Sequence, residues 1–292
     1  MTFEQRAPSM GLLIPQEGIY EYSDSISRVQ YRQLRSTLGD DVPLLGVYTS
    51  KTTGMPFNYI SYVSDSYQFI GNEALNNSVR SSIAEIRTPI FDEKIQLNYN
   101  WTMMYKEMII RHALNSRIAG DIYPNVITIN SYDGSRAANL SFGIFINSRN
   151  NNPNLSFGFR NKLGRLRQVH FQHARTRIST AVGGYMEAFS RGIVQLVEDN
   201  FNRRLNEDDM LKVLDAIESG TGKNRRTSIS TFLAEQARDT TSAWDLFHAI
   251  CRFSTIEGNL NIRIIMENIA ESVLVIPTQM MTVVDQVNQA RQ

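Results

Sequence analysis

The segment between residues 134 and 186 carries the residue types best suited to binding a charged partner. It contains none of the chain's 29 acidic residues, yet it holds eight of the 30 basic ones: Arg136, Arg149, Arg160, Lys162, Arg165, Arg167, Arg175 and Arg177. Aromatic rings and imidazoles are interleaved with these bases: Phe157, Phe159, Phe171, His170 and His173. A single strand of nucleic acid requires fixed cations for its phosphates and flat faces for its bases. The segment therefore predicts a surface that binds single-stranded DNA.

Within this segment, guanidinium and ammonium groups are expected to hold phosphates, and flat rings are expected to stack on bases. The predicted nucleic-acid-binding residues are Arg136, Arg160, Lys162, Arg165, Arg167, Arg175 and Arg177, together with Phe159, Phe171 and His170. The alternative is that these charges meet acidic faces of the same chain or of a neighbouring subunit. The protein is then a structural or scaffolding protein that forms a ring or other large homo-oligomer without nucleic acid.

A glycine-rich stretch, Gly220-Thr221-Gly222-Lys223, resembles part of a phosphate-binding loop. That loop also requires a glycine five residues before its Gly-Lys pair and a Ser or Thr after the lysine. Ile217 and Asn224 occupy these two positions, so both conditions fail. The stretch is therefore expected to end the preceding helix.

Other residues with catalytic or metal-binding chemistry lack the partners that such chemistry requires. His170 and His173 are spaced for one helical face, but no nearby Asp, Glu or Cys completes a metal shell. Cys251, the single cysteine, lies in an amphipathic helical pattern typical of a buried, inert thiol. We therefore predict no catalytic residue, no metal and no cofactor, and we interpret the protein as a non-enzyme.

Composition is that of an ordinary soluble globular protein. The chain has 292 residues, 42% of them hydrophobic, and a formal net charge of +1. A single cysteine excludes a disulfide framework and favours a reducing compartment. The sequence lacks a signal-peptide pattern and an apolar run long enough to cross a bilayer. These features predict a cytoplasmic protein that does not interact with membranes.

The elements that position the basic segment are expected to mix strands and helices. Residues 1–24, rich in Pro and Gly, are expected to form an N-terminal arm, and the apolar spacing over 25–38 predicts a helix. Alternating or β-branched stretches predict strands over 42–48, 57–63, 67–70, 95–110, 125–131 and 139–147, with a hairpin turn at 51–54. A further helix is predicted over 72–87. The Asp133-Gly134 pair predicts a type I′ hairpin before residue 139.

Strands become scarce after Phe159, and helical spacing takes over. An apolar stripe from Val182 to Phe201 predicts a long helix, and Asn206 followed by three acidic residues predicts the start of another. Shorter helices are predicted over 231–238, 242–253 and 261–274. The expected fold class is α+β, an N-terminal antiparallel sheet with helices followed by an all-α C-terminal region. The expected divisions are an arm at 1–24, a mixed domain at 25–178 and a helical region at 179–292.

Four stretches in this order resemble the phage/plasmid-like proteins classed as a domain of unknown function. They lie at residues 59–73, 130–137, 169–174 and 241–249, and the resemblance spans about residues 55–255. Where that family usually has a Cys-Asn pair, this chain has Ile146-Asn147. The resemblance implies a bacteriophage or mobile-element origin and a setting in the bacterial host cytoplasm.

The order of sheet and helix is also similar, at the level of fold alone, to phage single-strand annealing proteins of the Red-beta and RecT type. Those proteins form rings or filaments on DNA. The analogy and the basic segment together predict a homo-oligomer that binds single-stranded DNA and assists recombination or replication. The apolar residues of the arm, among them Phe3 and Leu13, are expected to pack against a neighbouring subunit.

Overall fold

Two compact units make up the chain in the computed structural model. Unit 1 comprises Met1–Asn77, Leu97–Met104 and Ile129–Ala138, and unit 2 comprises Ser78–Gln96, Tyr105–Thr128 and Asn139–Gln292. The structure describes residues 13–15, 20–23, 28–36, 41–50, 57–64, 70–98, 101–136, 138–147, 154–159, 165–167, 174–235, 241–278 and 280. The expected divisions at residues 24 and 178 remain predictions.

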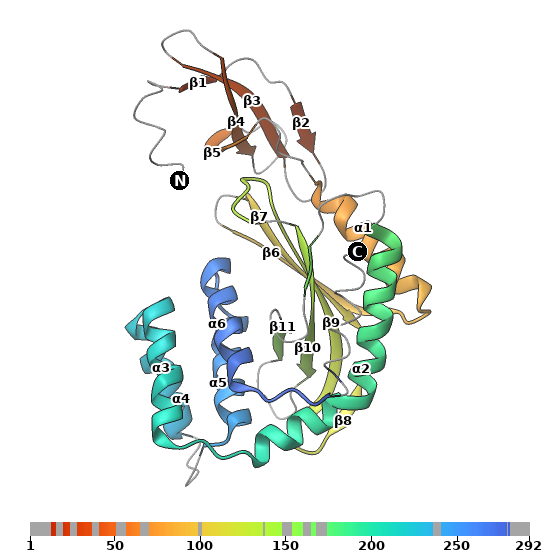
Figure 1. The fold of residues 1–292 in the computed structure, drawn as a ribbon, viewed down its shortest axis with the longest axis vertical. Coiled ribbons are helices and arrows are strands. Elements are labelled where there is room, and N and C mark those ends of the chain that lie inside the picture. The colour runs from red at the N-terminus through yellow and green to blue at the C-terminus, as the bar shows by residue number, and fades with distance from the viewer. Residues whose placement is uncertain are drawn as a thin grey trace. The chain divides into compact units, whose positions relative to one another are not determined.

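Unit 1 is built around a five-stranded antiparallel sheet (Figure 1). Its strands are β1 (Leu13–Pro15), β2 (Tyr20–Ser23), β3 (Arg28–Ser36), β4 (Asp41–Ser50) and β5 (Asn58–Ser64). Their order is β1-β3-β4-β5, and β2 also pairs with β3. One face buries a small apolar cluster: Val29, Tyr31, Val47, Val63 and Tyr132.

The helix predicted over 25–38 is wrong, because this stretch forms strand β3. Val29 and Tyr31 are buried while Gln30 and Arg32 are half-buried, which is the period of two that a strand produces. The pairing with β4 shifts register between Gln33 and Arg35. This irregularity buries Leu34 in a different cluster, so the spacing of Val29 and Leu34 imitated a helix. Two pieces of the expected arm, β1 and β2, also pair with β3.

Strands at 42–48 and 57–63 are confirmed by β4 and β5, which pair as expected of a hairpin. The predicted hairpin turn at 51–54 and the first three residues of the strand predicted at 67–70 lie outside the described residues. The helix predicted at 72–87 is confirmed as α1 (Asn72–Glu85).

Unit 2 contains most of a seven-stranded sheet of order β11-β10-β9-β7-β6, to which β12 adds beside β10 and β8 beside β9. Its strands are β6 (Ile90–Leu97), β7 (Met103–Ile110), β8 (Leu114–Ser116), β9 (Gly120–Ser131), β10 (Asn139–Asn147), β11 (Leu155–Phe159) and β12 (Arg165–Arg167). The single strand predicted over 95–110 is therefore two strands, and β11 and β12 were not predicted. The strand predicted at 139–147 is confirmed.

The connection after β9 is a longer turn than the predicted type I′ hairpin. Gly134 has a φ of 71°, but Arg87 and Trp101 are the non-glycine residues with positive φ in the described part of the chain, so Asp133 does not have the required conformation. Instead, Asp133 Oδ1 accepts a hydrogen bond from the Ser135 amide at 3.0 Å. Ser131 Oγ accepts from the Arg136 amide at 2.9 Å and donates to the Arg136 carbonyl at 2.7 Å. Pairing of β9 with β10 is nevertheless as predicted.

Helices cover the sheet of unit 2, with α2 (Ala174–Asn202) on one side and α5 (Ala243–Thr255) and α6 (Leu260–Val273) on the other (Figure 1). Helices α3 (Glu207–Thr221) and α4 (Lys223–Glu235) pack against each other. Asn206 caps α3 by accepting a hydrogen bond from the Asp209 amide, as its sequence position predicted. The predicted α+β class is confirmed, with an antiparallel sheet first and helices predominating in the second half of the chain.

Two ion pairs of Glu93 connect α1 with two strands of the unit 2 sheet. Glu93 on β6 pairs with Arg80 of α1 at 2.6 Å and with the buried Lys106 of β7 at 2.7 Å. The hydrogen bonds from Arg80 and then Lys106 lower the pKa of Glu93 to about 2, against the rise that burial alone would cause. This carboxylate is therefore ionised at neutral pH and holds the two cations in place.

Candidate functional site

Four of the five described basic residues of the segment lie on β12 and at the start of α2. Arg165 and Arg167 are on β12, which pairs antiparallel with β10 so that Ser141 is opposite Arg165 and Asn139 is opposite Arg167. Arg175 and Arg177 lie in the first turns of α2, a helix with no acidic residue in its first turn. The amide end of a helix has a positive potential, which adds to that of basic side chains.

Arg136 is half-buried in the turn that joins β9 to β10, and its main chain is held by Ser131. Four of the predicted binding residues, Arg160, Lys162, His170 and Phe171, lie outside the described residues. The structure therefore places Arg165 and Arg167 on one short strand but does not place the rest of the set around it.

Phe159 does not fit the predicted stacking role. Its side chain is 0% exposed and lies in the main apolar cluster of unit 2, with its ring 5.0 Å from that of Phe157. A buried ring cannot receive a base, so this prediction is wrong. Phe157 and Phe159 occupy inward-facing positions of β11, where alternation directs both rings into the core.

The glycine-rich stretch at 220–223 is a helix end, as predicted. Gly222 follows α3 with a φ of 99°, and its amide donates to the Glu218 carbonyl at 2.8 Å. A positive φ favours glycine, and this hydrogen bond satisfies a carbonyl at the end of the helix.

Cys251 is buried. Burial, and then the nearby Glu267, raise the pKa of its thiol well above the usual value, so it remains protonated.

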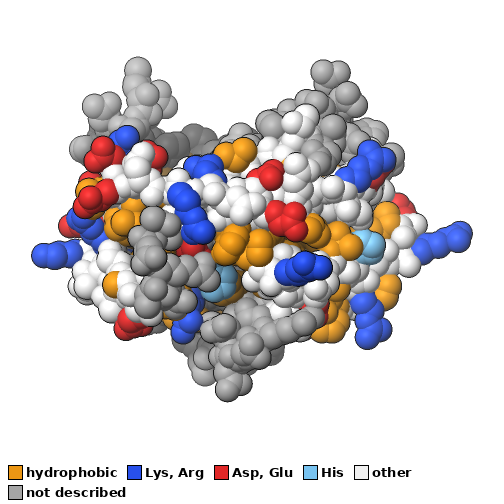
Figure 2. All heavy atoms as spheres, turned by 90° about the horizontal axis from the view of Figure 1, so that it is seen from below, with side chains coloured by type: hydrophobic (Ala, Val, Ile, Leu, Met, Phe, Trp, Pro, Cys, Tyr) orange, Lys and Arg blue, Asp and Glu red, His pale blue; other side chains and the backbone are white. Residues whose placement is uncertain are grey.

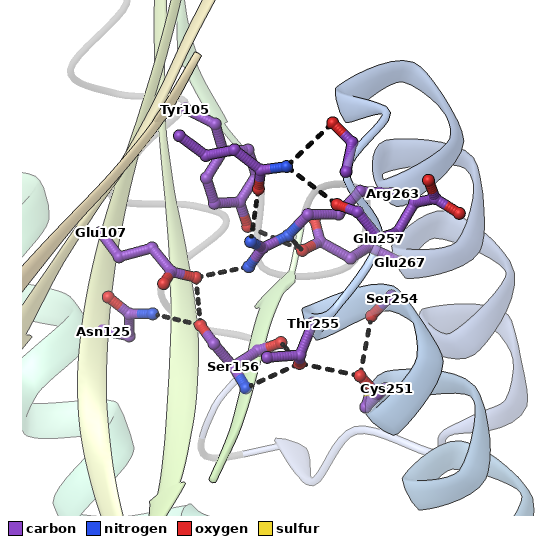
Figure 3. A network of polar contacts seen from close by, with 12 residues as sticks. Tyr105, Glu107, Asn125, Ser156, Cys251, Ser254, Thr255, Glu257, Arg263 and Glu267 are labelled. Atoms are coloured by element: carbon purple, nitrogen blue, oxygen red, sulfur yellow. Dashed lines mark hydrogen bonds and ion pairs between the residues drawn. The ribbon is translucent and has the colours of Figure 1, made fainter. Parts of the chain in front are cut away.

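A buried polar network joins the unit 2 sheet to α6 (Figure 3). Arg263 lies between two carboxylates, with Nη2 2.6 Å from Glu107 Oε1 and Nε 3.1 Å from Glu267 Oε1. Its guanidinium stands 4.1 Å from the ring centre of Tyr105, whose hydroxyl donates to Glu267 at 2.7 Å. Arg263 Nη1 also donates to Gln96 Oε1 at 3.1 Å. Strand alternation puts Tyr105 and Glu107 on one face of β7, and helical spacing puts Arg263 and Glu267 on one face of α6.

The network continues toward β9, β11 and α5. Ser156 Oγ of β11 donates to Glu107 Oε1 and accepts a hydrogen bond from the Asn125 side-chain amide at 2.9 Å. Thr255 Oγ1 of α5 accepts from the Ser156 amide at 3.2 Å and also contacts the Cys251 carbonyl at 2.8 Å. The side chains of Arg263, Glu107 and Glu267 are only 5%, 4% and 0% exposed. Since these groups bind one another and are enclosed, we assign the network to holding α5 and α6 on the sheet.

The sequence analysis missed this network, although a signal for it exists. Lys106 and Glu107 interrupt the otherwise apolar stretch of β7, and Arg263, Glu267 and Glu271 recur at a spacing of four in α6. Charged residues on the apolar face of an element indicate buried partners, because an isolated buried charge is very costly. What the sequence does not state is which strand and which helix meet.

Other chemistry in the described residues is limited. Those residues include no group of three or more His, Cys, Asp and Glu side chains placed to hold a metal ion. On the face seen in Figure 2, hydrophobic side chains form a band, and Lys or Arg side chains lie near Asp or Glu on both sides of it. Among the helices that the structure describes, none has the length and apolar character of a membrane span.

Comparison with known proteins gives one family. A model for a domain of unknown function, DUF932, matches residues 59–263. No curated protein and no solved structure matches the chain. The match begins at β5 and ends in α6, so it includes the described basic residues and most of the buried network.

Proposed function

Because this chain belongs to the DUF932 family, a domain of unknown function, we propose its function from its own residues: it binds single-stranded DNA along the segment 134–186. The protein acts without catalysis, as a homo-oligomer of the annealing type that assists recombination or replication. This proposal includes a phage or mobile-element origin and a place in the cytoplasm of the bacterial host. The proposal includes self-association, because annealing requires several chains to hold one long strand.

The observation that supports this proposal is the separation of charge along the chain. Between residues 134 and 186 eight basic residues occur with no acidic residue, while the remainder has 22 basic residues against 29 acidic ones. Phosphates bound by such a segment release counterions, which drives binding without regard to sequence. Arg165 and Arg167 lie two residues apart on β12, which suits two contacts to one extended backbone.

The test is the salt dependence of binding to labelled oligo(dT), measured by fluorescence anisotropy with the full chain. Each phosphate contact contributes about 0.7 to the slope of log affinity against log salt for a single strand. Replacing both Arg165 and Arg167 with Ala should therefore flatten the slope by about 1.4 and weaken binding similarly for all sequences.

The matched control is Arg191→Ala, which removes an arginine on α2 whose side chain is 66% exposed and paired with Glu187. It should leave the slope unchanged. If the double variant breaks up the oligomer and leaves DNA affinity as in the wild type, the segment is a subunit interface and the scaffold interpretation holds. A wild-type protein that retains no oligonucleotide at low salt refutes the proposal.

A further inference from the structure

One face of the unit 1 sheet carries arginines beside aromatic rings, and we call it the arginine–tyrosine face. It is formed by side chains of β3, β4 and β5: Arg28, Gln30, Arg32, Tyr48, Tyr59 and Tyr62. Register places them together, because Gln30 is opposite Tyr48, Tyr48 is opposite Tyr59, and Gly46 lies between Arg32 and Tyr62. Residues directly opposite in an antiparallel pair share a face. The other face holds the buried cluster around Val29 and Val47.

A bulge in β5 brings Tyr59 to this face. Val47 is opposite Ser61 but Tyr48 is opposite Tyr59, so Ile60 is an extra residue. Without this residue, alternation would direct Tyr59 and Tyr62 to opposite faces of the sheet. The extra residue moves the side chains before it to the other face, so Tyr59 and Tyr62 share one face. Bulges commonly redirect a side chain in this way.

Gly46 gives the ring of Tyr48 its position. A Cβ at Gly46 would lie 2.9 Å from Leu34 Cδ2 and 3.0 Å from Tyr48 Cε2. The ring therefore lies over Gly46, which is opposite Arg32 of β3, and the guanidinium of Arg32 stands 4.9 Å from the ring centre. On the other side, the rings of Tyr48 and Tyr59 meet edge to face with centres 5.3 Å apart. Arg32, Tyr48 and Tyr59 thus form a row across three strands.

Among the described residues, a side-chain amide holds the cation of this row. Arg32 donates to Gln30 Oε1 from Nε at 3.1 Å and from Nη2 at 2.6 Å. Within the described residues, no acidic side chain forms an ion pair with it. Arg28 forms a second cation–π contact near the row, with its guanidinium 4.8 Å from the ring centre of Phe57. All charged residues of β3 are arginines, and β5 contains no charged residue.

Tyr59 is the accessible end of the row. It is 52% exposed, whereas Tyr48 is 8% exposed beneath its neighbours. Burial raises the pKa of Tyr59, and the nearby hydroxyls of Tyr48 and Tyr62 raise it further, so the ring stays neutral near pH 7. A neutral, exposed ring supported from below is suited to stack with a nucleobase.

We propose that the arginine–tyrosine face is a second binding surface for single-stranded nucleic acid, with a base stacked on Tyr59 and phosphates held by Arg32 and Arg28. This inference rests on one part of the proposed function, that the ligand is single-stranded nucleic acid, and it assigns that ligand to a separate surface. Arginines beside an exposed ring match a strand in which every nucleotide carries a phosphate and a base.

The first test is oligo(dT) affinity of the full chain with Tyr59 replaced. Tyr59→Ala should weaken binding about fivefold or more with little change in salt slope, because one stacked base is lost. Tyr59→Phe keeps the ring and should bind as the wild type. Leu211→Ala, at a 40% exposed position of α3, is the control for loss of an exposed apolar side chain and should have no effect.

The second test is the charge. Arg32→Gln should reduce the salt slope by about 0.7, whereas Arg191→Gln should leave it unchanged. Circular dichroism confirms that each variant is folded. If folded Tyr59→Ala and Arg32→Gln both bind as the wild type, this inference is overturned.

The outcomes separate this inference from the proposed function. Binding weakened by the Arg165 and Arg167 changes but not by Tyr59→Ala supports the basic segment and refutes the arginine–tyrosine face. The reverse result supports the face and refutes the segment. A wild-type protein that binds no oligonucleotide refutes both. Should Tyr59→Ala instead abolish association between chains while oligonucleotide affinity is kept, the face binds a second copy and the inference is wrong.

Discussion

Arg263 is a cation buried between two carboxylates, and its role follows from what its removal would leave behind. Glu107 and Glu267 each lie within about one hydrogen-bond length of it, at 2.6 and 3.1 Å, and both are enclosed. Such a pair adds little compared with a well-packed apolar core, but breaking it leaves uncompensated buried charge. The same logic applies to Lys106, which is 1% exposed and paired with Glu93.

We expect Arg263→Ala to lower the free energy of unfolding by about 3 to 5 kcal/mol, because two carboxylates lose their cation. Urea denaturation followed by circular dichroism measures the change. Arg191→Ala removes an arginine from an exposed pair and should alter stability by less than about 0.5 kcal/mol. An Arg263→Ala protein as stable as the wild type would show that the network does not hold α6 on the sheet.

At the scale of elements, two glycines with different surroundings show how β10 and α2 are constrained. A Cβ at Gly143 would lie 2.0 Å from the Phe157 carbonyl oxygen and 3.0 Å from Gly158 Cα, both main-chain atoms of β11. Neither can move without separating the paired strands, which are in register at Gly143 and Gly158. A Cβ at Gly183, inside α2, would meet nothing within 4 Å beyond its chain neighbours and the backbone of its own helix.

Gly143→Ala should therefore destabilise the protein by about 3 kcal/mol, at the upper end of the usual cost of overpacking. Gly183→Ala should stabilise it by about 0.5 to 1 kcal/mol, since alanine favours a helix interior. Denaturation midpoints of the two variants and the wild type test both expectations together. A Gly143→Ala midpoint equal to that of the wild type would contradict the close approach of β10 and β11.

At the scale of the whole molecule, the expected role of the N-terminal arm changes. Leu13–Pro15 forms β1 and pairs with β3 of its own chain, so this piece of the arm has a partner within unit 1. The prediction of a homo-oligomer now rests on the proposed function, because annealing requires several chains to hold one strand. A closed ring is the arrangement in which equivalent interfaces are all satisfied.

Light scattering at micromolar concentration should give the mass of several chains, with or without oligo(dT). The matched comparison is the Arg165→Ala, Arg167→Ala protein, which should keep the wild-type mass because, under the proposed function, its changed residues contact DNA and not a subunit. A monomer under both conditions would refute self-association.

The sequence alone determined the features that depend on neighbours along the chain. Long apolar stripes predicted α2, Asn206 predicted the start of α3, and the alternation at 139–147 predicted β10, because period and capping are local properties. The failure of the phosphate-loop pattern at residues 217–224 was also readable, and Gly222 ends the helix there. The family resemblance likewise required only the order of short stretches.

Tertiary structure decided which side of an element faces the core and which distant elements meet. Phe159 was expected to stack on bases, but the packing of β11 buries it. Register irregularities in β3 and β5 changed the faces of Leu34 and Tyr59, which no local period reveals, because one extra residue reverses the alternation. The meeting of Glu107 with Arg263 joins residues 156 positions apart. Such a contact depends on the packing of helix against sheet, and that packing is settled only when the whole core forms.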